Sequence, residues 1–134
     1  MKPVVLFKAR TVKESEAFMD TFIATVAKLK AKDMKGALEA AQKSAEYNDN
    51  ATAHKIAGTA AFSLKQFQVA AESFEAYLAM NPNAKDKTQT MYQCGSAYQS
   101  LGDAAKACGY FKQIAQDPKW GEGARYQMTV LKCN

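Results

Sequence analysis

The sequence predicts an all-α protein made of repeated helix pairs, and three observations carry this prediction. Two segments, 51–82 and 88–118, match one another at a spacing of 37 residues, which is the mark of a repeat architecture. Apolar residues recur along several stretches at the helical period of 3.6. Turn-forming and capping residues separate these stretches instead of interrupting them. At 134 residues, we expect one domain with its own core.

The N-terminal part predicts a degenerate helix pair over 11–50. Residues 3–10 alternate weakly and are compatible with an extended arm, whereas Thr11 and Glu14 have capping-box spacing. A helix is therefore expected from about residue 12 to about residue 30, with the apolar stripe Phe18, Phe22, Val26 and Leu29.

Asp33 can cap the second helix of this pair, which is expected to end at Tyr47. Thr25 and Val26 stand where the two clear copies carry glycine. We therefore expect looser packing in this first pair.

The two clear copies predict four helices. In the first copy, the Asn48-Asp49-Asn50 segment ends the preceding helix and caps a helix over 51–64, and a short turn leads to its partner over 66–80. Residues 83–87 form an insertion at the helix junction, where it disturbs the fold least. Helices at 87–101 and 103–116 make the second copy.

A cap helix over 119–132 is expected to close the array. Asp117 is placed to cap it, with Pro118 at its first position. Ala124, Met128 and Leu131 give this helix an apolar face, and its other face is polar. Stacked repeats end in a helix of this kind.

Each clear copy places a small residue opposite an aromatic one. In the first copy, Gly58 and Ala70 leave space between two antiparallel helices, and Phe74 fills the space beside them. In the second copy, the corresponding residues are Gly95, Ala107 and Phe111.

This pattern resembles the tetratricopeptide repeat, which has a Gly in its first helix, an Ala and an aromatic in its second, and a terminal Pro. Tyr98 matches the aromatic after the Gly, and the Leu101-Gly102-Asp103 segment matches the usual turn. His54 and Met91 depart from the pattern, because the family prefers Trp there. The resemblance implies a right-handed superhelical array of antiparallel helix pairs.

The resemblance also implies a concave groove lined by the first helix of each repeat. The positions so placed are mostly polar, with a few apolar and aromatic ones: Lys55, Ile56, Thr59, Phe62, Gln89, Tyr92, Gln93, Ser96 and Gln99. Amides and hydroxyls can pair with the backbone of an extended peptide, while Phe62 and Tyr92 take a side chain. Another protein or an extended peptide is therefore the expected partner. The alternative is an ordinary wet surface on a spacer module.

Composition favours a non-enzyme without cofactor or metal. The single His, His54, is expected on a packing face as a hydrogen-bonded core residue, and no nucleophile elbow or phosphate-binding Gly loop occurs. The net charge of +5 allows a nucleic-acid or anionic-surface binder as the alternative function. The lysines are interspersed with acids, which favours solvated helix faces. A monomer is favoured over an oligomer.

The three cysteines leave several alternatives open. Buried free thiols and a Cys94–Cys108 bridge are two of them, and a zinc site with His54 is a third. We favour a disulfide between Cys108 and Cys133, because the two neighbouring helices bring these positions together. Such a bond implies an oxidising compartment. The chain is therefore expected to be the mature part of an exported protein, with a cytoplasmic protein as the alternative. No membrane insertion is expected, since the longest apolar run is Val4 to Phe7.

Overall fold

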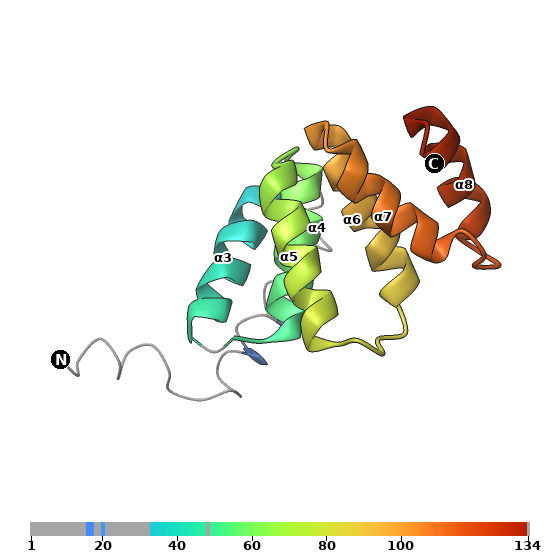
Figure 1. The fold of residues 1–134 in the computed structure, drawn as a ribbon. Helices are drawn as coiled ribbons and strands as arrows, with labels where there is room; N and C mark the ends of the chain where they lie inside the picture. The colour runs from blue at the N-terminus through green and yellow to red at the C-terminus, as the bar shows by residue number, and fades with distance from the viewer. Residues whose placement is uncertain (1–15, 18–19, 21–32, 48, 134) are drawn as a thin grey trace.

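The structure, a computed structural model, describes residues 16–17, 20, 33–47 and 49–133. The described part of the chain has helices and no strand, so the all-α prediction is confirmed (Figure 1). The helices are α3 (Met34–Tyr47), α4 (Ala51–Ser63), α5 (Phe67–Met80), α6 (Lys87–Leu101), α7 (Ala104–Ile114) and α8 (Gly121–Leu131).

Most of the expected helix at 12–30 lies outside the described residues, although residues 16, 17 and 20 are helical. The expected arm at 3–10 and the loose packing at Thr25 and Val26 also lie outside them.

Local backbone and side-chain features explain where α4 and α7 begin and where α6 ends. The Asn50 side chain accepts a hydrogen bond from the Ala53 N–H at 2.8 Å and so caps α4, as predicted. Asp103 caps α7 in the same way through the Lys106 N–H at 3.1 Å. Between these helices, Gly102 ends α6 with φ +83°, a left-handed backbone that glycine adopts without strain.

The last helix begins later than the sequence predicts. The Asp117 carboxylate accepts hydrogen bonds from the N–H groups of Lys119 (2.9 Å) and Trp120 (2.8 Å). It therefore closes a turn, and the regular helix α8 starts only at Gly121. Asp117 caps this turn as predicted, since its carbonyl also accepts the Gly121 N–H at 2.8 Å. Only the start of the regular helix differs from the prediction, by three residues from Pro118.

Glycine and phenylalanine hold each helix pair together. A Cβ atom on Gly58 would lie 2.7 Å from the Phe74 ring, and one on Gly95 would lie 3.1 Å from the Phe111 ring. Both phenylalanines are fully buried. The predicted contact between small and aromatic residues is therefore present in both copies, between α4 and α5 and between α6 and α7.

The helices stack in chain order, with α3 and α8 at the two ends (Figure 1). In this view, α5 and α7 lie in front of α4 and α6. The core between them is rich in alanine, which allows close approach of the backbones: Ala41, Ala53, Ala57, Ala60, Ala61, Ala70, Ala71, Ala97, Ala107 and Ala124. Among the described residues, no helix combines the length and apolar character needed to cross a membrane.

Candidate functional site

The residues predicted to line a groove lie on α4 and α6. Thr59 and Gln89 are exposed. The other seven are half-buried: Lys55, Ile56, Phe62, Tyr92, Gln93, Ser96 and Gln99. Several of these side chains contact neighbouring helices, so they do not form one open strip.

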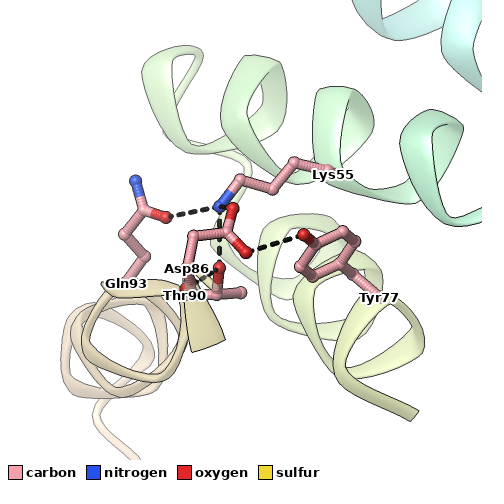
Figure 2. A network of polar contacts seen from close by, with 5 residues as sticks. All are labelled: Lys55, Tyr77, Asp86, Thr90 and Gln93. Atoms are coloured by element: carbon pink, nitrogen blue, oxygen red, sulfur yellow. Dashed lines mark hydrogen bonds and ion pairs between the residues drawn. The ribbon is translucent and has the colours of Figure 1, made fainter. Parts of the chain in front are cut away.

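Lys55 links α4 to the beginning of α6 (Figure 2). Its Nζ donates to Thr90 Oγ1 at 2.7 Å and to Gln93 Oε1 at 3.5 Å. It also lies 3.2 Å from Asp86 Oδ2. Lys55 was predicted to face a ligand, but here it serves as a bridge between two helices.

Tyr77 of α5 completes this polar network. Its hydroxyl donates to Asp86 Oδ1 at 2.7 Å, and Lys55 Nζ lies 5.3 Å from the centroid of its ring (Figure 2). The hydrogen bond to Asp86, together with burial and the carboxylate charge, raises the pKa of Tyr77 to about 12.

Asp86 is held ionised by the same contacts. Burial acts to raise its pKa, but hydrogen bonds from Tyr77 and Lys55 and the Lys55 charge together bring the pKa below its ordinary value. Asp86 stands at the N-cap position of α6 but turns its carboxylate to Lys55 and Tyr77, away from the helix N–H groups. The Lys55–Asp86 ion pair and its hydrogen bond to Tyr77 thus connect α4, α5 and the beginning of α6.

Helix α8 covers two of the predicted groove residues. The Tyr92 ring lies 5.4 Å from the Trp120 ring between centroids, and a Cβ atom on Gly123 would be 3.3 Å from that Tyr92 ring. Further along α6, Gln99 Nε2 donates to Gln127 Oε1 at 3.0 Å. Tyr92 and Gln99 therefore support the packing of α8 instead of lying free for a ligand.

Two apolar positions on α4 are likewise used inside the fold. Phe62 packs edge to face against Phe67, with 5.3 Å between ring centroids, and Ile56 packs against the core. Of the predicted set, Thr59 and Gln89 are the exposed polar residues.

The structure adds a hollow that the sequence did not predict. It has a volume of about 350 Å³ and lies between the α5–α6 loop and the α7–α8 turn. Gln89, a predicted groove residue, is part of its wall, and the lining is Lys85, Asp86, Thr88, Gln89, Asp117, Lys119 and Trp120. A second hollow of about 300 Å³ shares Thr88 and Asp117 with it.

Charged side chains of both signs line the hollow. Its two carboxylates are already engaged, because Asp86 pairs with Lys55 and Tyr77 while Asp117 accepts two backbone N–H groups. Lys85 and Lys119 are exposed, and Lys119 Nζ lies 5.6 Å from the centroid of the Trp120 ring. The sequence signal for this site was the single tryptophan beside a lysine, directly after Asp117-Pro118.

His54 is not a core residue. Its Nε2 lies 2.5 Å from Asp49 Oδ1, and both residues stand near the beginning of α4. The Asp49 side chain is 68% exposed, so this contact is at the surface. The prediction of a buried packing histidine is corrected: position 54 lies in the first turn of α4, where it meets the residues that precede the helix.

The favoured prediction for the cysteines, a Cys108–Cys133 disulfide, is present in the structure. Cys108 is disulfide-bonded to Cys133, with 5.8 Å between their Cα atoms. Cys94 keeps a free, buried thiol, and burial raises the pKa of this thiol to about 12. Such a thiol is not nucleophilic near neutral pH.

Within the described residues, no group of three or more His, Cys, Asp or Glu side chains is arranged to hold a metal ion. Comparison of the chain with protein-family models, with curated protein sequences and with solved structures finds no match.

Proposed function

We propose that the chain is a non-catalytic protein-interaction module of the tetratricopeptide type, with its helix pairs in a right-handed superhelix. The repeated contacts of Gly58 with Phe74 and of Gly95 with Phe111 support this repeat reading. The partner is a protein that presents an extended segment. This segment lies along the exposed polar positions of α4 and α6 and enters the hollow beside Trp120.

The hollow is the observation that carries the proposal. Its size suits one or two side chains, and its wall combines an indole ring with amide and hydroxyl groups. Aromatic residues in such hollows contribute more binding energy than the polar residues around them. Because Lys85 and Lys119 face the same space, the segment is expected to place an acidic side chain there.

A peptide screen tests this function. The immobilised chain is exposed to a library of random unstructured peptides, and selected peptides are measured by calorimetry against folded variants. We expect Trp120→Ala to weaken binding by about 1–2 kcal/mol and Gln89→Ala by less, because water replaces a partly exposed amide. Gln68→Ala is the matched control on α5, where Gln68 is exposed and bonded to Glu72. Equal effects of Gln68→Ala and Gln89→Ala would contradict the proposal.

Salt dependence separates a peptide partner from a polyanion. One acidic side chain beside two lysines loses a modest part of its affinity as salt rises. A nucleic acid would instead lose affinity steeply and linearly on logarithmic axes. The second result would favour the alternative of a nucleic-acid or anionic-surface binder.

We further propose that the protein works in an oxidising compartment after export. The Cys108–Cys133 bond supports this location, since disulfides persist there and are rare in the cytosol. Rapid alkylation of native material followed by mass spectrometry tests it. Two alkylated thiols at positions 108 and 133 would contradict it.

A further inference from the structure

The disulfide fastens the far end of the last helix. Cys108 lies in the middle of α7, and Cys133 follows the end of α8. Between these helices runs the turn that Asp117 closes. The bond therefore closes a loop that contains all of α8 and the turn that leads into it from α7.

The other contacts of α8 are concentrated near its beginning. Gly121 and Ala124 are the only buried residues of this helix, and the Arg125 guanidinium donates to the Ala115 carbonyl. Later positions are exposed or half-buried, and Tyr126 and Val130 are 65% and 51% exposed. Beyond Arg125, the helix is held by half-buried Met128 and Leu131, by one amide pair and by the disulfide.

The surface beneath α8 includes residues of the predicted groove. Tyr92 lies under Gly123 and Trp120, and Gln99 is paired with Gln127. Both would become accessible if α8 turned outward about the Asp117 turn. An outward turn of α8 leaves the contact of Gly95 on α6 with Phe111 on α7 in place.

We propose that the Cys108–Cys133 bond is a redox latch that holds α8 over the Tyr92 and Gln99 part of α6. A dithiol reductant opens the latch. One of its thiolates attacks a sulfur of the bond, the S–S bond breaks, and a mixed disulfide forms. The second thiol of the reductant resolves this intermediate. Cys108 and Cys133 each take up a proton and are left as thiols, and the reductant is oxidised to its own cyclic disulfide.

Accessibility supports the chemistry. Cys108 and Cys133 are both half-buried, whereas Cys94 is fully buried. The consequence for binding rests on the proposed function: the open form adds Tyr92 and Gln99 to the surface that an extended segment contacts. The latch itself is tested without any ligand, so its failure and the failure of the proposed function are distinguishable.

Hydrogen exchange of the full chain, followed by mass spectrometry, tests the latch. The oxidised chain is compared with the same chain after treatment with dithiothreitol, and with Cys108→Ser. Loss of a loop closure of this length shifts the balance of open and closed forms by up to about 400-fold. We expect amide exchange in the second half of α8 to speed up by up to that factor, while exchange in α4, α5 and α6 stays unchanged.

Cys94→Ser is the matched control, since it removes a cysteine but leaves the bond. It should exchange like the wild type when oxidised and open like it when reduced. The single tryptophan gives a second measurement, because release of α8 should shift Trp120 emission to the red. Unchanged exchange in α8 after reduction would overturn the latch. Faster exchange throughout the chain would also overturn it, since the bond would then stabilise the whole fold instead of one helix.

Discussion

At the scale of single residues, the backbone of Lys65 is in a strained conformation. Lys65, in the turn between α4 and α5, has φ +63°. A side chain in this left-handed region costs about 1 kcal/mol, whereas glycine adopts it freely. The Lys65 N–H still donates to the Phe62 carbonyl at 3.0 Å, so the turn is well formed despite this cost.

We therefore predict that Lys65→Gly raises the free energy of unfolding by about 0.5–1 kcal/mol. Urea denaturation measures the change. Lys65→Ala is the control, because it removes the charge and keeps the Cβ atom. Equal stability of the two variants would show that the backbone of this turn is not strained.

Asp86 should make stability depend on pH in the acid range. Its folded pKa is depressed below the ordinary value of 3.8. Its contribution is therefore fully present above pH 3.8 and is lost as pH falls through the folded pKa. Asp86→Asn should be less stable than the wild type at neutral pH, and this difference should shrink below pH 3.8. A difference that is constant between neutral and acid pH would contradict the ion pair with Lys55.

Lys55 illustrates what residue patterns can predict. Its place on the first helix of a repeat was predictable, and the structure puts it there on α4. The contacts that Lys55 makes were not predictable, because Thr90 belongs to the next repeat and Asp86 to the insertion before it. Their distance from Lys55 depends on how successive pairs stack. A single sequence does not specify that stacking angle.

At the scale of the helix pair, three helical glycines differ in how closely a neighbouring side chain approaches them. A Cβ atom on Gly58 would meet Phe74 at 2.7 Å, one on Gly95 would meet Phe111 at 3.1 Å, and one on Gly109 would meet nothing within 4 Å. All three lie inside helices. Alanine there gains up to about 1 kcal/mol of helix propensity, and the clash opposes this gain.

We predict that Gly58→Ala destabilises the fold by about 1–3 kcal/mol and that Gly109→Ala stabilises it by about 0.5–1 kcal/mol. Gly95→Ala should fall between them. Thermal or urea unfolding gives the order. Should Gly58→Ala melt at or above the wild-type temperature, the close contact between α4 and α5 would be wrong.

Helix boundaries were predictable where side-chain caps act locally. Asn50 and Asp103 cap the helices that follow them, and both can be recognised from a few adjacent residues. The start of α8 was not predictable in this way. Asp117 could be recognised as a capping residue, but the regular helix begins only at Gly121, where a Cβ atom would lie 2.5 Å from the Ala115 carbonyl oxygen.

For the whole molecule, the repeat predicted the stacked helix pairs but not the candidate binding site. The period, the turns and the contacts between small and aromatic residues can all be read along the chain. The hollow joins residues 85–89 to residues 117–120, and no local pattern shows that these two segments face each other. The proposed binding site must therefore be tested by binding measurements on the folded protein.

The most direct test of the proposed function is hydrogen exchange of the intact chain with and without a selected peptide. Protection should appear at 85–93 and 117–123, around the hollow and along the adjoining turns of α6 and α8. It should be absent on the outer faces of α5 and α7. Protection confined to α5 and α7, with none at Gln89 or Trp120, would contradict the proposed binding surface.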